Sequence, residues 1–187
     1  MRFNILVIAA SVGLIVCALP NVPHAFGPAL QGTGVQKAVL TIPPSLAAEH
    51  EEIHEELTAA TRVPGEVGAA AKALATVLHP HFERENQIAL PPLALLAPLA
   101  AGKAPAGLQE ALAMSDALRK ELPRMMEEHE RIRAATEKLR EVARKEKASV
   151  HERFAERLAA HARTEEEVLY PAAILVGDII RARMAQK

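Results

Sequence analysis

The chain has 187 residues, of which 50% are hydrophobic and only 3% aromatic, and its formal net charge at neutral pH is −1. This length suits one well-buried domain, and the scarcity of aromatic residues beside abundant alanine favours packed helices over a β-sandwich or barrel. Basic and acidic residues are interspersed, so no charged surface typical of nucleic-acid binding is indicated. We therefore expect an all-α protein without a nucleic-acid partner.

The first 25 residues have the pattern of a secretory signal. Arg2 supplies a positive charge, and the stretch from Ile5 to Leu19 is almost uninterruptedly apolar. We expect residues 1–25 to direct export to the periplasm or the extracellular space, without membrane contact after cleavage; an uncleaved segment would be a short membrane anchor. The only cysteine, Cys17, lies in this stretch, so histidines and carboxylates are the strong metal ligands of the mature chain.

A linker and two helices are predicted next. Residues 26–41 contain several glycines and no sustained periodicity, which indicates an extended linker before a domain at 42–187. Helical spacing of apolar residues predicts one helix from near Ile42 to just before Pro64 and a second from Glu66 to Leu90. The residues expected on their inner faces are Leu46, His50, Ile53 and Leu57, followed by Leu74, Leu78, His81 and Ile88.

Two more helices are predicted after a packed apolar connection at 93–105. A long helix should run from about Gly107 to Lys147 with a bend at Pro123, and Ser149-x-x-Glu152 has the pattern of a capping box that opens the last helix. Together the helices are expected to form an up-down-up-down four-helix bundle. The inner faces of the last two are expected to carry Leu118, Leu122, Met125, His129, Ile132, Thr136 and Leu139, then Phe154, Leu158, His161, Glu165 and Val168.

The two predicted helix pairs carry the same polar motif, so the bundle is expected to consist of two helix-pair repeats. Each pair has one histidine on its first helix and a His-x-x-x-Glu motif on its second, and the two histidines of a pair stand 31 or 32 residues apart. The residues of this pattern are His50, His81 and Glu85 in the first pair and His129, His161 and Glu165 in the second.

The repeated pattern has a chemical interpretation. Residues four apart share a helix face, so each His-x-x-x-Glu motif presents an imidazole and a carboxylate inward. Buried carboxylates are costly unless cations or hydrogen bonds neutralise them. Imidazole and carboxylate without thiolate suit iron, zinc, manganese or copper, and the two glutamates could bridge adjacent ions. The sequence therefore predicts a metal site formed by these six residues, whereas His24, His79 and His151 lack such partners and are not expected to be ligands.

The order His, then His-x-x-x-Glu, repeated on four helices, resembles the HHE cation-binding domain of the hemerythrin family. The segments from His81 to Glu85 and from Leu169 to Pro171 are also similar to sequences of this family. The resemblance extends from about residue 42 to the C-terminus. It implies a hemerythrin-like bundle with a non-haem centre of two iron ions, bridged by carboxylates, that binds dioxygen or reacts with it.

The sequence departs from the oxygen-carrying members of that family at two positions. The resemblance implies a fifth histidine one turn after the third-helix ligand, but Arg133 stands there, while His54 occupies the repeat-related position of the first helix. We therefore predict His54 as an additional ligand and expect Arg133 to turn outward or pair with a carboxylate. The carriers also use an aspartate where this chain has Glu166; the repeat favours Glu165 as the bridge, with Glu166 as the alternative.

Three functions are compatible with this ligand set. The first is a di-iron protein that carries, senses or stores dioxygen or a similar small diatomic ligand. The second is a di-iron oxidoreductase that reduces dioxygen or peroxide, and the third is a zinc-binding or metal-free structural bundle. No general base or nucleophile is evident outside the metal set, which favours binding over catalysis.

Overall fold

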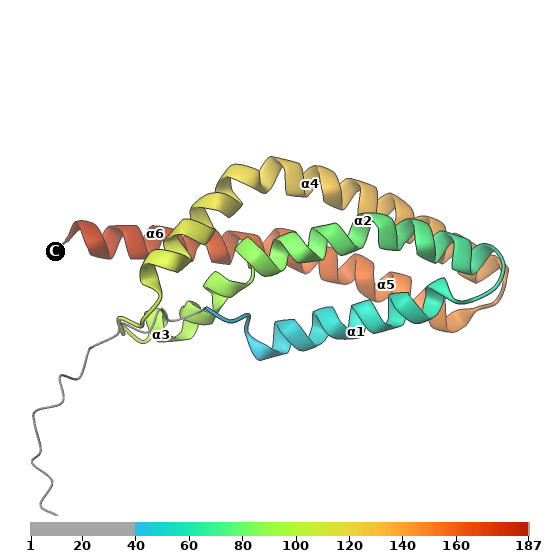
Figure 1. Ribbon diagram of the computed structural model, residues 1–187, viewed down its shortest axis with the longest axis horizontal. Helices are drawn as coiled ribbons and strands as arrows, with labels where there is room; N and C mark the ends of the chain where they lie inside the picture. Colours follow the sequence, from blue (N-terminus) through green and yellow to red (C-terminus); the bar gives the residue numbers. More distant parts are fainter. Residues whose placement is uncertain (1–39, 187) are drawn as a thin grey trace, which may run out of the picture. The chain divides into compact units, whose positions relative to one another are not determined.

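The structure is a computed structural model that describes residues 40–186. The expected signal at 1–25 and nearly all of the expected linker at 26–41 lie outside the described residues and stay predictions. Within the described part, every regular element is helical (Figure 1). No helix in this part is both long and apolar enough to cross a membrane.

The first helix pair consists of α1, Pro44–Thr61, and α2, Glu66–Ile88. Proline is tolerated in the first turn of α1 because its missing N–H would have no partner there. Gly65 joins the two helices with a φ of 84°, a left-handed conformation that glycine adopts without strain. The residues predicted for the inner faces of both helices are buried, apart from Leu46, which is half-buried.

A short connection leads to the longest helix. It contains a 3₁₀ turn, η1, Pro91–Leu95, and a short helix, α3, Leu96–Ala100. The long helix, α4, runs Leu108–Lys145 and contains Pro123, and Figure 1 shows that it is bent. A proline inside a helix removes one backbone hydrogen bond, which gives this bend its cause. Helix α4 packs against α2 and also against the last helical segments.

The last helical segment comprises α5, Ser149–Thr164, a π-helical turn, η2, Glu165–Leu169, and α6, Tyr170–Ala185. The predicted capping box at its start is wrong. Ala148 is the N-cap, and no side chain caps the helix. The carboxylate of Glu152 instead accepts a hydrogen bond from Arg144 at 2.7 Å, so an ion pair to the preceding helix replaces the expected cap.

The π-helical turn changes which residues face the core. The N–H of Tyr170 donates to the carbonyl of Glu165, five residues earlier rather than four. The wider turn rotates the following residues relative to a regular α-helix. Val168, predicted on the inner face, is therefore 54% exposed, whereas Tyr170 is 1% exposed.

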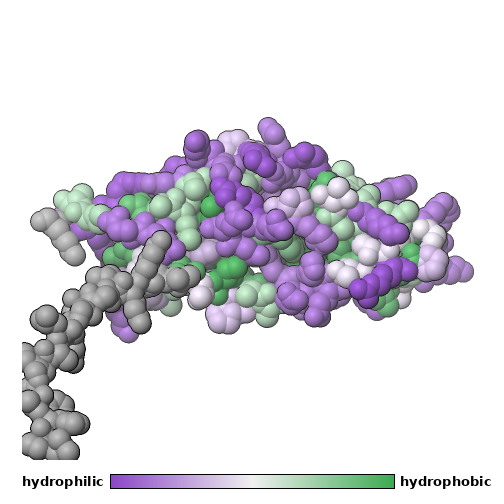
Figure 2. Space-filling view, viewed as in Figure 1, coloured by the Kyte–Doolittle hydropathy of each residue, from purple (hydrophilic) through white to green (hydrophobic). Residues whose placement is uncertain are grey.

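The helices α1, α2, α4 and the α5–α6 segment form a four-helix bundle with an apolar cluster on either side of its buried histidines. On α1, for example, His50 lies between Leu46 of one cluster and Ile53 of the other, and on α4, His129 lies between Met125 and Ile132. The face of the molecule in Figure 2 is largely hydrophilic. The fold thus holds a polar layer inside an otherwise apolar core.

Candidate metal centre

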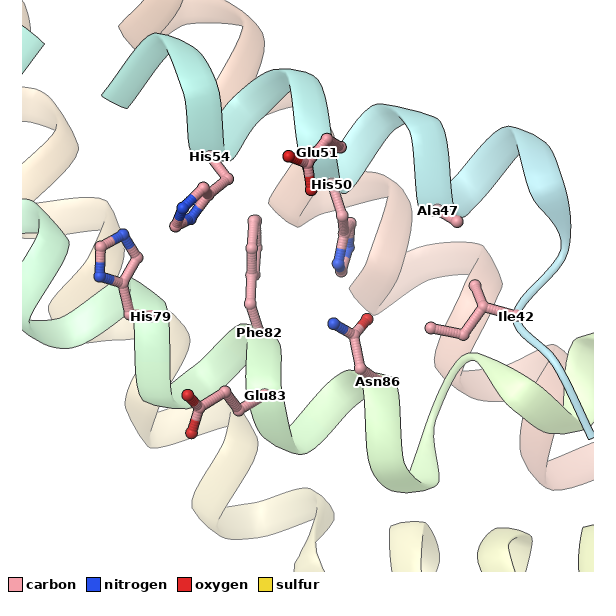
Figure 3. Close-up of a pocket in the computed structure, with 9 residues that line it drawn as sticks. All are labelled: Ile42, Ala47, His50, Glu51, His54, His79, Phe82, Glu83 and Asn86. Carbon is pink, nitrogen blue, oxygen red and sulfur yellow. The ribbon is translucent and has the colours of Figure 1, made fainter. Parts of the chain in front are cut away.

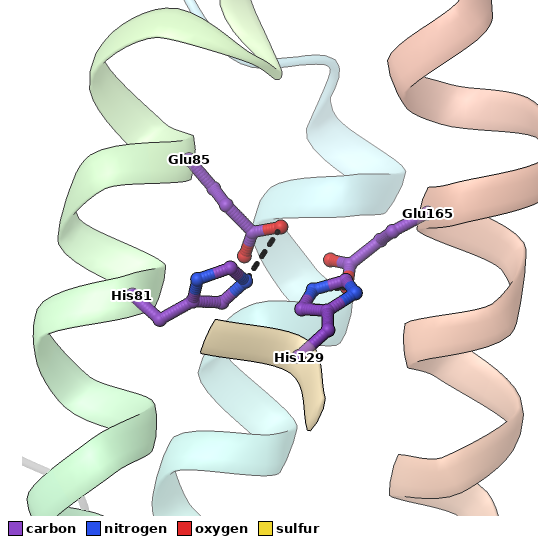
Figure 4. Close-up of side chains that lie close together, drawn as sticks. All are labelled: His81, Glu85, His129 and Glu165. Carbon is purple, nitrogen blue, oxygen red and sulfur yellow. Dashed lines mark ion pairs between the residues drawn. The ribbon is translucent and has the colours of Figure 1, made fainter. Parts of the chain in front are cut away.

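Six histidines and glutamates meet in the polar layer of the bundle. They are the only buried histidine and carboxylate side chains among residues 40–186, and each is at most 6% exposed. Figure 4 shows four of them converging from α2, α4 and the start of η2. The six are those of the repeated sequence pattern: His50, His81, Glu85, His129, His161 and Glu165.

The six residues form two potential ligand groups that share one carboxylate. In each group, one ligand atom from every residue lies within 4.8 Å of the others. Glu165 belongs to both groups, so its two carboxylate oxygens are placed to bridge two ions. The groups are His81, Glu85, His129 and Glu165, and His50, His161 and Glu165.

All four imidazoles direct Nε2 towards the two central carboxylates. The closest approach is 2.8 Å, between His161 Nε2 and Glu165 Oε1. The other distances to the nearest central oxygen are 3.3 Å from His50 Nε2 to Glu165 Oε1, 3.4 Å from His81 Nε2 to Glu85 Oε1, and 3.5 Å from His129 Nε2 to Glu165 Oε2. Nitrogen and oxygen donors therefore converge on a small volume.

Outer carboxylates fix the orientation of three of these rings. Each of the three imidazoles donates from Nδ1 to a glutamate outside the cluster, which is the arrangement by which metal-binding histidines are usually held. The three pairs are His81 with Glu128 at 3.0 Å, His161 with Glu49 at 3.0 Å, and His129 with Glu166 at 2.6 Å. His50 is the exception, because its buried Nδ1 has no hydrogen-bond partner within residues 40–186.

Glu166 therefore has a supporting position rather than a central one. The sequence left Glu165 and Glu166 as alternatives for the bridge, and the structure places Glu165 in the cluster and Glu166 behind His129. Arg133 also pairs with Glu166 and with Glu130. This guanidinium is thus held by carboxylates outside the cluster.

The charged groups of the cluster shift one another's pKa values. Burial and the charge of Glu165 raise the pKa of Glu85. Burial also opposes ionisation of Glu165, but hydrogen bonds from His161 and His50 outweigh it and hold the pKa of Glu165 below its usual range. Although burial opposes protonation, Glu85 and Glu165 raise the pKa values of His81 and His161 to about 9.

The donor chemistry of the cluster fits metal cations. Two buried carboxylates a few ångströms apart repel each other, and the cluster compensates with imidazolium groups. One oxygen of Glu85, Oε2, is buried without a hydrogen-bond partner within the described residues. Divalent cations would replace the protons and complete the coordination of these oxygens and nitrogens.

Tyr170 is a site residue that the sequence reasoning did not select. Its hydroxyl donates a hydrogen bond to Glu85 Oε1 and lies 3.1 Å from His129 Nε2 and 3.3 Å from His81 Nε2. Burial and the charge of Glu85 raise the pKa of Tyr170, so this hydroxyl keeps its proton. The repeat contained a signal for its burial. Tyr170 corresponds to Leu90 of the first helix pair, and an apolar residue at that position indicates that it faces the core.

His54 is the one predicted ligand that the structure does not bring to the cluster. Its side chain is exposed, and its ring lies beside that of His79, with the ring centroids 4.9 Å apart. Phe82 stacks on His50 with a centroid distance of 4.1 Å and stands between His50 and His54 in Figure 3. The expectation from helical geometry fails because this phenyl ring occupies the space through which His54 would reach the centre.

A surface pocket adjoins the cluster between α1 and α2. Its volume is about 440 Å³, and its lining includes His50, Phe82 and Asn86 (Figure 3). One residue of the cluster therefore lies on the wall of a space that opens to solvent. The residues that face this space come from the first helix pair alone, apart from Ile42 just before α1.

A comparison with protein families identifies the same domain. The family model described as hemerythrin HHE cation binding domain matches residues 41–173. This range is more than half of the chain and includes all six clustered residues and Tyr170. No curated protein and no solved structure matches the chain significantly. The chain belongs to the hemerythrin family, and its buried histidines and glutamates form a cluster that could hold metal cations.

Proposed function

We propose that the protein binds two iron ions in this cluster and, through them, dioxygen or a similar small diatomic ligand. The observation that carries the proposal is the pair of ligand groups that share Glu165. One group offers four protein ligands and the other three. A structural zinc site usually has four protein ligands around one ion, whereas a shared carboxylate and open coordination positions are typical of reactive di-iron centres.

Each residue of the site has a distinct role in this proposal. The four imidazoles would bind through Nε2, Glu165 would bridge, and Glu85 would complete the group of His81 and His129. The outer carboxylates hold three imidazoles in the ligating orientation and raise their basicity. Iron bound there would supply the redox chemistry that binding of dioxygen requires.

The pocket beside α1 and α2 supports binding of a small ligand. A volume of about 440 Å³ is ample for a diatomic molecule, and His50 lies on its wall. On the opposite side, Arg133 and Glu166 form an ion pair next to His129, so access from that side is obstructed. The pocket of the first helix pair is therefore one route by which a small ligand would reach the cluster.

Tyr170 favours a second candidate function, reduction of dioxygen or peroxide. A buried phenol that donates a hydrogen bond to Glu85 beside two ligand imidazoles is placed to supply a proton. An oxidoreductase of this kind also needs an external electron donor. Turnover of dioxygen with a reductant, slowed in Tyr170→Phe, would support this function; binding that reverses without turnover would exclude it.

Metal analysis together with the visible spectrum tests the main proposal. Protein purified from iron-replete cells should contain about two iron ions per chain and absorb in the visible, with a change that reverses when dioxygen is removed. His81→Ala and His161→Ala should each lose one or both ions, whereas the control His151→Ala should keep both. Stoichiometric zinc without visible absorption would reject the redox function and leave the fold unaffected.

A further inference from the structure

Two histidines outside the central cluster form a pair between the first two helices. His54 lies on α1 and His79 on α2, and their ring centroids are 4.9 Å apart with the ring planes inclined by 41°. Figure 3 shows the two rings facing each other across the helices. An ion about 2.0–2.1 Å from one nitrogen of each ring needs imidazoles at about this separation.

A carboxylate accompanies each histidine of the pair. Glu83 follows His79 by four residues on α2, and Glu51 precedes His54 by three on α1. Both spacings place the carboxylate and the imidazole on one face of their helix. All four residues line the same pocket (Figure 3). The pocket therefore carries two carboxylates in addition to the histidine pair.

The environment of His79 suits a ligand. Its Nε2 is buried and has no hydrogen-bond partner within residues 40–186. His54 is exposed, which gives an ion direct access from solvent.

We propose that His54 and His79 form a separate site for one divalent transition-metal ion such as Zn²⁺ or Cu²⁺. Imidazoles are donors that these ions prefer, and water would fill the remaining positions. The negative charge of Glu83, which lines the same pocket, would attract the cation. The site is distinct from the central cluster because Phe82, which stacks on His50, stands between them. It does not depend on which metal occupies the centre.

Counting bound zinc in matched variants tests this site. The full-length protein, with its central metal in place, is dialysed against buffered Zn²⁺, and zinc and iron per chain are measured. The parent protein should bind one more zinc ion than the His54→Gln/His79→Gln double variant, while His151→Gln should bind as much as the parent. Equal zinc binding by the parent and the double variant would overturn the proposal.

Two further readouts keep the test independent of folding and of the di-iron proposal. Cu²⁺ added to the parent protein should give an electron paramagnetic resonance signal with coupling to two imidazole nitrogens, absent from the double variant; coupling to fewer nitrogens would contradict the site. Glu83→Gln should weaken binding of the additional ion. Central metal content and the visible spectrum should be the same in the parent and the double variant, so a failure of either site is recognised separately.

Discussion

The two helix pairs place their buried histidines and glutamates alike but differ in what surrounds them. Beside His129, Glu166 accepts the Nδ1 proton and pairs with Arg133, so a carboxylate and a guanidinium close that side. At the repeat-related positions of the first pair stand Asn86 and His54, and the side is open as a pocket. A tyrosine hydroxyl also enters the cluster from the second pair only.

This difference indicates that holding a metal ion and admitting a small ligand place different constraints on the sequence. A donor atom must lie within about 0.2 Å of its ideal distance from a bound ion, which would explain why the clustered residues of the two pairs stand at matching positions in the sequence. Residues beside the cluster are not constrained in this way, so they can differ between the two pairs. In the proposed function, the second pair would hold the centre in place and the pocket of the first pair would admit the small ligand.

The largest effect is expected from removing the carboxylate that both ligand groups share. Glu165→Ala should lose both metal ions. The group of His50 and His161 would have no carboxylate left, and the group of His81 and His129 would keep only Glu85. Glu85→Ala affects only the group of His81 and His129, so it should retain more metal. Metal content per chain measures both outcomes. An unchanged metal content in Glu165→Ala would show that the two groups are not joined by this residue.

His81 of the first pair and His161 of the second have similarly raised pKa values, which predicts a large pH dependence. The pKa values of His81 and His161 are raised from 6.5 to about 9 in the metal-free protein, so their stabilising contribution is full below pH 6.5 and is lost as pH rises through 9. Metals bind neutral imidazole. Apparent metal affinity should therefore rise over this window by about tenfold per pH unit for each proton displaced.

Thermal unfolding with and without metal measures this pH dependence. The difference in Tm between metal-loaded and metal-free protein should widen from pH 6.5 to 9, as the metal-free form loses its imidazolium contribution. A difference that stays constant over this range would mean that metal binding displaces no proton from these histidines.

A smaller effect on metal affinity should distinguish the side closed by Glu166 and Arg133 from the side that is open as a pocket. Glu166→Gln removes the carboxylate that holds Nδ1 of His129, and metal affinity should fall by about 10- to 100-fold. Asn86→Ala is the matched control, because it alters the repeat-related position where no such hydrogen bond exists within the described residues. Chelator competition measures both affinities. Equal losses in the two variants would remove the distinction between the sides.

The smallest effect is expected at His54. His54→Gln should keep both central ions and change the free energy of unfolding of the metal-loaded protein by no more than about 0.5 kcal/mol, because the side chain is exposed. Metal content and denaturant unfolding measure this. Loss of a central ion would reinstate His54 as the additional ligand that the sequence suggested.

The sequence was sufficient for the helices and for the six clustered residues. Periodicity located the long helices to within a few residues, since apolar side chains must cover one face of each. The repeat pointed to the six clustered residues because it placed ionisable residues at matching positions on the inner faces of both pairs. His81 and Glu85, for example, are adjacent in space as their spacing of four predicted.

Features that depend on local departures from a regular helix could not be predicted in this way. The π-helical turn at Glu165 turns Val168 outward and Tyr170 inward, and a period of 3.6 residues does not anticipate it. The position of His54 depends on Phe82, whose repeat-related residue is Ala162. A ring that is present in one pair alone cannot be inferred from what the pairs share.

Anomalous X-ray scattering from crystals of the iron-loaded protein tests the central claim most directly. Two iron peaks about 3.5–4 Å apart should lie in the cluster, one beside His81 and His129 and the other beside His50 and His161, with Glu165 in contact with both. A single peak, or two peaks of which only one contacts Glu165, would contradict a centre built on a shared carboxylate.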